Sequence, residues 1–311
     1  MVVCDPYWKE TYWSLYKYEP SMPGAAIFCC LFGLSLILHA LQMVRSRTWY
    51  LSALLIGAAC ETIGYASRII SATEDPGCWT LGPYVTQNIL ILIAPPFFAA
   101  SIYMILGRII LLTEGEAYAV IKRRWLTKVF VTGDVISLLM QGSGGGMMAT
   151  GEDLLKTGEK IIIAGLFIQL AVFGFFVIVG AIFHYRMSRN PTHLACHPSI
   201  RWKNYLLTLY VTSALIWVRS VFRVIEYIQG NDGYLMSREA FLFAFDGMLM
   251  LMMLLWMNWF HPSEIGVLLR GGEPVKHGLE LVTKTRSGRT MALTMESNAS
   301  SQGPVANGPL A

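Results

Sequence analysis

The sequence predicts an all-α integral membrane protein, a bundle of seven transmembrane helices with the amino terminus outside the cytosol and the carboxyl terminus inside it. Composition is the first observation: 54% of the 311 residues are hydrophobic and 14% are charged, whereas soluble domains carry about 25% charged residues. The second observation is a series of long apolar stretches. The third is an alternation of charge between the loops that join them.

Each of the seven apolar stretches has about 20 or more residues, enough to cross about 30 Å of hydrocarbon as a helix. They occupy residues 22–44, 49–70, 84–112, 126–149, 160–184, 204–228 and 240–260. The fourth stretch is the least apolar, because Lys128, Asp134, Gln141 and the glycine-rich run 142–146 interrupt it. It is kept as a span because the loop charges alternate only if the chain crosses there.

The loop charges set the predicted orientation. Alternate loops are rich in basic residues, namely Arg45, Arg47, Lys122, Arg123, Arg124, Arg186, Arg189, Arg201, Lys203 and Arg270. The remaining loops are mostly acidic and carry Glu74, Asp75, Glu152, Asp153, Lys156, Glu159, Asp232, Arg238 and Glu239. Since basic loops of membrane proteins face the cytosol, we expect the first set inside.

This orientation divides the chain into three parts. Residues 1–21 form an extracellular segment, 22–262 the seven-helix domain, and 263–311 a cytosolic tail. We expect the tail to be disordered, because its few apolar residues cannot offset the entropy cost of ordering it. Cys4 and Cys78 both fall on the predicted exterior, so a disulfide between them is possible, and two unpaired thiols are the alternative.

Polar side chains inside the spans are the candidates for a functional site, because a charge at mid-bilayer costs about 2.5 to 3.5 kcal/mol on insertion scales. Glu61, Tyr65 and Arg68 are spaced i, i+4 and i+7 and so share one helical face. The other members of the predicted ligand-binding or gating set are Gln87, Gln141, Arg219, Arg223, Glu226 and Asp246. Glu61 falls near mid-membrane and the others in its outer half, which indicates a hydrated polar cavity closed toward the cytosol. The alternative is a salt-bridge network that only fixes helix packing.

Two further features of the spans carry predictions. Asp134 lies nearer the cytosolic end of its span, where it could pair with Lys128 or another basic group. Asp134 and Asp246 are the candidates for proton coupling. Pro95 and Pro96 lie near the centre of the third span, where they should kink the helix and free backbone carbonyls, so they are a candidate hinge, with a fixed kink as the alternative.

Several function classes lack their sequence signals. The chain has no phosphate-binding loop, no basic stripe typical of nucleic-acid binding, and no lysine in the last span that could carry a retinal Schiff base. His39, His184 and His261 lie near the cytosolic ends of different spans without the paired spacing of metal ligands. We therefore predict no enzyme activity, no metal site and no cofactor.

A series of residues in chain order resembles the fungal lipid-translocating exporter family, the aminosterol-resistance and sphingoid long-chain-base-release proteins. They are the string 18–21, Glu61, Gly64, Tyr65, Arg68, Gln87, Ala94, Pro95, the strings 100–103 and 107–108, Asp134, Gln141, Gly144, Gly165, Gln169, the string 219–223, Glu226, Asp246, His261 and Pro262. The resemblance covers about residues 18–262 and leaves out the tail.

The resemblance implies a seven-helix protein of the plasma membrane, or of an endomembrane, that is connected with export or tolerance of amphiphiles such as sphingoid bases and sterol derivatives. The first expectation is a translocator whose ligands are membrane lipids or amphiphilic small molecules, with buried acids that receive an ammonium group. The alternative is a receptor-like sensor of membrane lipid state that regulates other transporters. The resemblance implies no particular protein partner.

Overall fold

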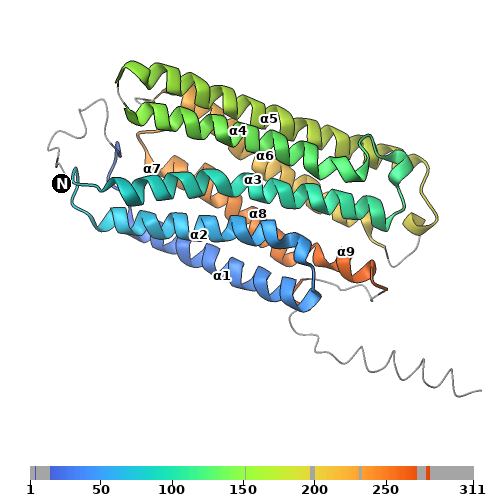
Figure 1. The fold of residues 1–311 in the computed structure, drawn as a ribbon. Helices are drawn as coiled ribbons and strands as arrows, with labels where there is room; N and C mark the ends of the chain where they lie inside the picture. The colour runs from blue at the N-terminus through green and yellow to red at the C-terminus, as the bar shows by residue number, and fades with distance from the viewer. Residues whose placement is uncertain are drawn as a thin grey trace, which may run out of the picture.

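The protein is a bundle of long helices that run side by side, shown by a computed structural model that describes residues 4, 15–150, 152–196, 200–230, 233–271 and 278–280 (Figure 1). The long helices are α1 (Met22–Ser46), α2 (Ser52–Thr73), α3 (Leu81–Leu112), α4 (Arg123–Thr150), α5 (Glu152–Arg189) and α6 (Trp202–Gln229). The last long helix is built from α7 (Glu239–Phe241), the π-helix η4 (Leu242–Gly247) and α8 (Met248–Trp259), and the short α9 (Ser263–Leu268) follows. Short 3-10 turns occur at η1 (Trp49–Leu51), η2 (Glu116–Tyr118) and η3 (Leu194–Cys196).

The all-α prediction is confirmed, since the described residues contain helices and turns and no strand. Six helical segments are long and apolar enough to cross a membrane by length and composition. They are Met22–Ser46, Trp49–Thr73, Leu81–Leu112, Lys156–Arg189, Trp202–Gln229 and Glu239–Leu268. The chain is therefore a multi-pass membrane protein. The fourth predicted span, α4, is a helix of 28 residues but is not among the six, because its polar residues dilute it.

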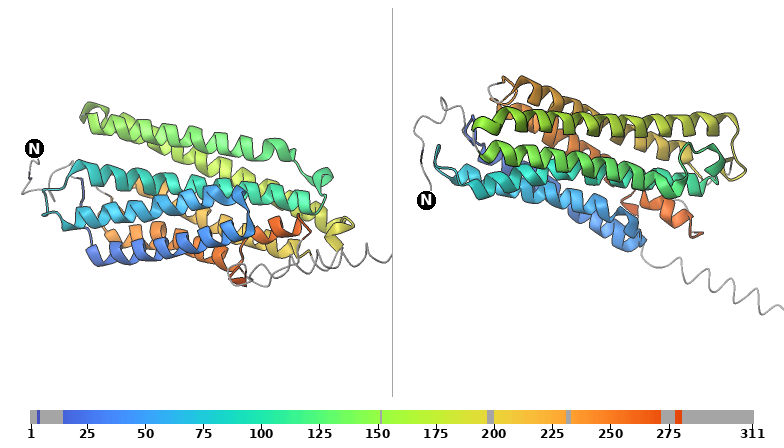
Figure 2. Two further views of the ribbon diagram at one scale, coloured as in Figure 1. Left: turned by 60° about the horizontal axis from the view of Figure 1, so that its bottom comes forward. Right: turned by 45° about the horizontal axis from the view of Figure 1, so that its top comes forward.

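Neighbouring helices in the sequence are also neighbours in space. α1 packs on α2, α2 on α3, and α4 lies along α5 for nearly its whole length (Figures 1 and 2). α3 is central, since it contacts α2, α4 and α6, and α6 in turn packs against α8. Consequently α2, α3, α6 and the last helix enclose one common interior.

The connection between α4 and α5 differs from the sequence prediction. We expected a loop of about ten residues before a span that begins at residue 160, whereas α4 ends at Thr150 and α5 begins at Glu152. The stretch 152–160 contains good helix formers, among them Leu154, Lys156 and Glu159, so the helix extends before the apolar span. The two helices therefore form a tight hairpin.

The segment that follows residue 262 begins with structure. α9 packs against α1 and α3, and its Ser263 and Ile265 are fully buried. Gly278 also contacts the bundle, because its backbone N–H donates to the Trp259 carbonyl at 2.8 Å. The part of the predicted tail after residue 280 lies outside the described residues.

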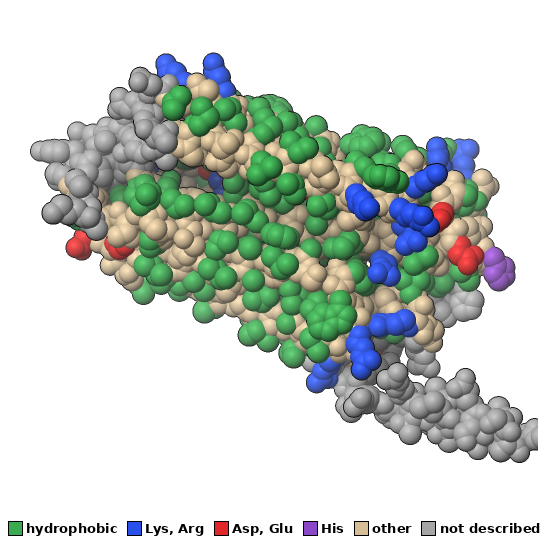
Figure 3. Space-filling view, viewed as in Figure 1, with side chains coloured by type: hydrophobic (Ala, Val, Ile, Leu, Met, Phe, Trp, Pro, Cys, Tyr) green, Lys and Arg blue, Asp and Glu red, His purple; other side chains and the backbone are tan. Residues whose placement is uncertain are grey.

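The outer surface has the character of a protein in lipid. Ile27, Leu34 and Ile37 of α1 are more than half exposed, although they are large and apolar. Figure 3 shows hydrophobic side chains along the sides of the bundle and Lys and Arg gathered at the end where α9 lies. Apolar sides and a basic end are the pattern that a bilayer imposes on a helical bundle.

Candidate functional site

Five of the predicted site residues lie together between α2, α6 and η4, and we name them the central charged cluster: Glu61, Arg219, Arg223, Glu226 and Asp246. Asp246 forms ion pairs with both arginines. Its Oδ1 pairs with Arg219 Nε, and its Oδ2 pairs with Arg223 Nη2. Arg223 also donates from Nη1 to Glu226 Oε2 at 2.9 Å. The side chains of Arg219 and Asp246 are 3% and 0% exposed, so these charges are paired away from solvent.

The local structure of α6 and η4 explains this pairing. Arg219, Arg223 and Glu226 stand four and three residues apart, which places them on one face of α6. Asp246 lies in the π-helix, whose wider turn carries its carboxylate toward that face. The next residue, Gly247, has no room for a side chain because Tyr65 and Phe28 pack against its backbone. Single π turns of this kind are frequent at functional sites.

The prolines of α3 provide a further partner for the cluster. Pro95 has no N–H, so the carbonyl of Ile91, four residues earlier, lacks its helical hydrogen bond. Arg219 Nη2 donates to this carbonyl at 3.1 Å. α3 continues as a helix through Pro95 and Pro96. The free backbone carbonyl that the sequence predicts therefore accepts a hydrogen bond from Arg219 of the cluster. The hinge role of the two prolines stays a prediction.

Glu61 differs from the other members of the cluster. It is 1% exposed, and neither of its carboxyl oxygens has a hydrogen-bond partner among the described residues. It lies within electrostatic reach of Asp246, Arg219 and Arg223. One helical turn on, the hydroxyl of the fully buried Tyr65 also lacks a hydrogen-bond partner in that part of the chain. The cluster thus holds three carboxyl groups against two guanidinium groups.

Aromatic rings enclose this side of the cluster. Tyr65 stacks on Phe28 and Phe32 of α1 at ring-centroid distances of 5.3 and 5.5 Å. Phe243 of η4 stacks on Phe28 at 5.2 Å. The surroundings of Glu61 and the Tyr65 hydroxyl are therefore apolar on the α1 side, and the nearby charges come from α6 and η4.

Arg68 and Gln87 belong to a second group at the end of the bundle where the amino-terminal segment lies. Arg68 Nη2 donates to Glu239 Oε1 at 2.6 Å and to the Tyr18 hydroxyl at 3.0 Å. The Tyr16 hydroxyl donates to Gln87 Oε1 at 2.9 Å, and the backbone N–H of Ser21 donates to Glu239 Oε1 at 2.8 Å. We call these six residues, Tyr16, Tyr18, Ser21, Arg68, Gln87 and Glu239, the N-terminal clamp.

The clamp fixes residues 15–21 over the end of the bundle. Tyr16 is almost fully buried against Trp79 and Tyr84, with ring centroids 5.1 Å from each. This burial raises the pKa of Tyr16 to about 12, so its hydroxyl remains a hydrogen-bond donor at neutral pH. A disulfide also links Cys4, nearer the amino terminus, to Cys78 in the connection between α2 and α3.

From its position in the sequence, Glu239 falls in a predicted loop, and Tyr16 has no predicted role. The one signal that could have indicated Glu239 as a partner of Arg68 is its position, because the first residue of a helix after a loop can turn back into the bundle. Tyr18 and Ser21 fall in the string 18–21 that carried part of the family resemblance.

Gln141 is separate from both groups. Its Nε2 donates to Gln169 Oε1 at 3.0 Å, across the α4–α5 contact. Gly144 and Gly165 lie at the same contact, where a Cβ on either would meet backbone atoms of the facing helix within 3.0 Å. Gln141, Gly144 and Gly165 therefore belong to the α4–α5 contact, and Gln141 lies apart from the central charged cluster.

Asp134 is also separate and does not pair with Lys128. It accepts a hydrogen bond from the Tyr103 hydroxyl at 2.9 Å and is 3% exposed. Phe176 lies 4.5 Å from the Tyr103 ring and Phe130 lies 5.3 Å from it, measured between ring centroids. Lys128 instead places its Nζ 5.6 Å from the centroid of the Trp125 ring, because its long stem reaches back toward the helix end.

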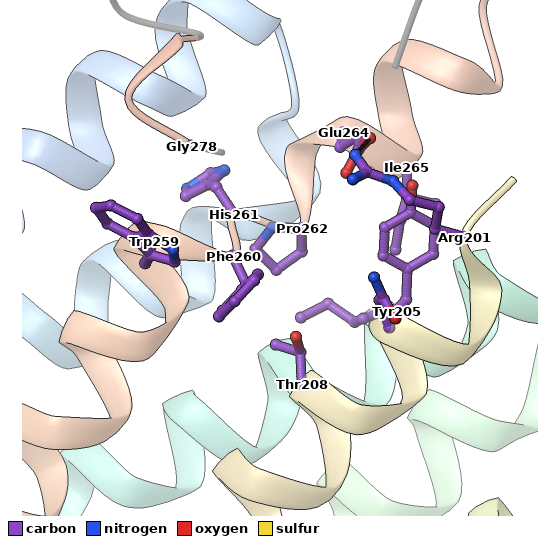
Figure 4. Close-up of a pocket in the computed structure, with 12 residues that line it drawn as sticks. Arg201, Tyr205, Thr208, Trp259, Phe260, His261, Pro262, Glu264, Ile265 and Gly278 are labelled. Carbon is purple, nitrogen blue, oxygen red and sulfur yellow. Dashed lines mark hydrogen bonds and ion pairs between the residues drawn. The ribbon is translucent and has the colours of Figure 1, made fainter. Parts of the chain in front are cut away.

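Two hollows lie away from the central charged cluster. One, of about 40 Å³, lies at the α9 end, where Arg201 and Glu264 point toward each other (Figure 4). Arg201 Nη2 donates to Glu264 Oε1 at 2.9 Å, and this hydrogen bond raises the pKa of Arg201. The other is an apolar groove of about 530 Å³ between α5 and α6, with Ser213 and Trp217 in its lining.

His39 and His261 are neighbours at the α9 end, which their sequence positions did not indicate. Their ring centroids are 5.3 Å apart, and His39 Nε2 lies 3.2 Å from the Leu254 carbonyl oxygen. A metal site needs further ligands, and the described residues contain no group of three or more His, Cys, Asp or Glu side chains placed to hold an ion.

Comparison with known proteins identifies relatives over most of the chain. The family model described as RTA1-like protein matches residues 54–267. Protein RTA1 of Saccharomyces cerevisiae is 35% identical over 266 residues, covering 78% of this chain and 82% of the relative. The lipid-translocating exporter-like protein RTA1 of Leptosphaeria maculans is 29% identical over 276 residues, covering 80% of this chain and 51% of the relative.

A third relative has a name that states its substrate. The sphingoid long-chain base transporter RSB1 of Saccharomyces cerevisiae is 25% identical over 275 residues, covering 75% of this chain and 69% of the relative. No solved structure matches the chain.

Proposed function

The chain belongs to the RTA1-like family, which confirms the resemblance to lipid-translocating exporters, and we propose that it moves amphiphilic lipids or lipid-like toxic compounds across its membrane and so supports export or resistance. Relatives named for lipid translocation and for sphingoid-base transport support a role in lipid transport. They are named as transporters, which agrees with the prediction that the chain is not an enzyme.

The observation that carries the proposal for this chain is the central charged cluster. Five ionisable side chains from three helical elements lie together inside one bundle, four of them buried and Arg223 half-buried, although each charge costs free energy to place there. A packing role alone would be served as well by apolar side chains, since replacement of buried ion pairs by hydrophobic residues is often neutral or stabilising. The presence of these charges in the bundle therefore favours a ligand-binding or gating role.

The proposal includes seven spans. α4 has 28 residues, which at about 1.5 Å of rise per residue gives about 42 Å, more than the hydrocarbon thickness. It lies along α5, which is one of the six apolar segments, for nearly its whole length. Its polar residues Asp134 and Gln141 have partners within the bundle rather than facing lipid.

The proposed orientation has the amino terminus outside and the carboxyl terminus in the cytosol. Support comes from the Lys and Arg side chains at the α9 end of the bundle (Figure 3). The disulfide at the opposite end supports the same orientation, because disulfides persist outside the reducing cytosol. The proposed location is the plasma membrane, with an endomembrane as the alternative.

The test is reconstitution of the purified protein into liposomes with amphiphiles that carry a fluorophore on the tail. We expect the protein to speed their movement between leaflets over that in protein-free liposomes. Glu226→Gln and Asp246→Asn should reduce transport per correctly inserted molecule, with Glu116→Gln, an exposed residue at the α9 end, as the control. A chain that senses lipid state would move no amphiphile by itself, and unchanged transport per molecule in both cluster variants would leave the cluster a packing role.

A further inference from the structure

Glu61 stands out as the one acid of the central charged cluster that has no ion pair or hydrogen bond of its own among the described residues. Asp246 is paired with both arginines, and Glu226 is paired with Arg223. Both oxygens of Glu61 are buried and lack a hydrogen-bond donor. The cluster therefore carries one carboxyl group more than its arginines can neutralise.

The groups that face Glu61 determine how it can be neutralised. Asp246 approaches from η4, Arg219 and Arg223 approach from α6, and Tyr65 and Cys60 lie beside it on α2. The facing part of α1 presents the rings of Phe28 and Phe32, which carry no charge. Both arginines are already engaged with Asp246, so neither is free to serve Glu61 alone.

An unpaired carboxylate in such an enclosure is unfavourable and must take up a positive charge. A proton is the smallest such charge and needs no additional space, which matters because Gly57, Gly64 and Gly247 show that the helices around Glu61 are in close contact. When the helices separate, a larger cation can replace the proton. An anionic head group would instead add to the excess of negative charge.

From these observations we propose that Glu61 is the proton-binding site of the transport cycle, and that a lipid-like cation with an ammonium head group takes the place of that proton. This inference rests on the translocation proposed above and specifies its coupling and the residue that carries it. One proton leaves the Glu61 carboxyl as one ammonium group enters, and the reverse exchange occurs at the other membrane face. Since one positive charge replaces another, the exchange is electroneutral.

The experiment uses the full-length protein in liposomes with a trapped pH-sensitive dye. The probe is a long-chain alkyl quaternary ammonium with a fluorophore on its tail, which cannot release a proton and so cannot carry one by itself. We expect a pH gradient to drive probe movement by the wild type, with about one proton counted in the opposite direction for each probe molecule. A membrane potential imposed with potassium and valinomycin should leave the coupled rate unchanged within twofold.

Variants test whether Glu61 is the residue that couples proton release to probe binding. Glu61→Gln should lose at least tenfold of the gradient-driven rate, whereas Glu61→Asp, which keeps a carboxyl, should retain one-for-one exchange. Asp134→Asn tests the rival buried acid and should keep the coupling, as should the exposed control Glu116→Gln. If Glu61→Gln does not fold, the proton counts of the wild type and of Glu61→Asp still show whether probe movement is coupled to proton exchange.

The outcomes separate the two proposals. A wild type that moves the probe at equal rates with and without a pH gradient overturns the coupling and leaves translocation in place. Loss of coupling in Asp134→Asn with its retention in Glu61→Gln overturns the assignment to Glu61. A wild type that moves the probe no faster than protein-free liposomes overturns both this inference and the proposed function.

Discussion

Asp246→Asn and Glu61→Gln should differ in their effect on stability, although each replaces a carboxyl group of the same cluster by its amide. Asparagine at 246 keeps the shape of the side chain but ends its ion pairs with Arg219 and Arg223. Glutamine at 61 replaces a carboxyl group that accepts no hydrogen bond from the described residues. The first change should destabilise the fold, while the second should leave it unchanged or stabilise it.

The structure sets the size of the first effect. Loss of one partner from a buried ion pair costs about 3 to 5 kcal/mol, because the remaining charge is stranded. Arg223 keeps Glu226 at 2.9 Å, and Arg219 keeps the Ile91 carbonyl at 3.1 Å. These remaining partners place the expected loss for Asp246→Asn at the lower end, about 3 kcal/mol. At about 2 to 4 °C for each kcal/mol, this corresponds to a fall in Tm of about 6 to 12 °C.

The assay is thermal unfolding of the purified protein in one detergent, followed by intrinsic tryptophan fluorescence and by loss of the monodisperse peak in size-exclusion chromatography. Glu116→Gln is the matched control, because its ion pair with Arg123 is exposed and worth about 1 kcal/mol or less. A Tm of Asp246→Asn equal to that of the wild type would refute the argument that buried pairing holds α6 to η4. A fall in Tm for Glu61→Gln as large as that for Asp246→Asn would show that Glu61 has a partner after all.

Three other predictions follow from the topology and from single contacts. A tag placed after Pro309 should be protected from external protease in intact cells, and its cleavage would reverse the proposed orientation. Cys4→Ser and Cys78→Ser should each expose one new external thiol to an impermeant alkylating reagent, whereas labelling of both cysteines in the unreduced parent would exclude the bridge. Tyr103→Phe leaves Asp134 buried without its hydrogen-bond donor and should lower the free energy of unfolding by about 1 to 3 kcal/mol, measured by the same thermal assay; an unchanged Tm would show that another donor serves Asp134.

Helical periodicity accounts for the part of the central charged cluster that the sequence indicates. Spacing of three and four residues places Arg219, Arg223 and Glu226 on one face of α6, where both arginines pair with Asp246 and Arg223 also pairs with Glu226. The cost of burying charge then required that acids and bases from different helices meet. Asp246 in the last helix meets that requirement.

The same reasoning could not say which neighbour each polar residue meets. Arg68 shares a helical face with Glu61, yet its guanidinium lies beside the first turn of the last helix and pairs with Glu239. Gln141 was assigned to the cavity by depth alone, whereas the α4–α5 hairpin places it against Gln169. Depth and face are local properties of one helix, but the partner depends on the packing of two.

The π-helix is the feature for which the sequence carried no signal. A turn with i→i+5 hydrogen bonds holds more residues than an α-helical turn, so it changes the direction of every later side chain relative to an ideal helix, and Leu242–Gly247 contains no proline. The register that brings Asp246 to the arginines could therefore be found only from the fold.

The contacts within the cluster also connect α3, α6 and the last helix through the side chains of Arg219 and Asp246. Arg219 binds both Asp246 of η4 and the Ile91 carbonyl that Pro95 frees in α3. Movement of α6 would therefore break an ion pair with the last helix and a hydrogen bond with α3 at the same time. An ammonium cation that bound between Glu61 and Asp246 would compete with Arg219 for Asp246, and would weaken both connections together. The ion pair with Asp246 of the π turn and the hydrogen bond to the carbonyl that Pro95 frees thus meet at Arg219. Binding of a positively charged ligand can therefore favour separation of α3, α6 and the last helix.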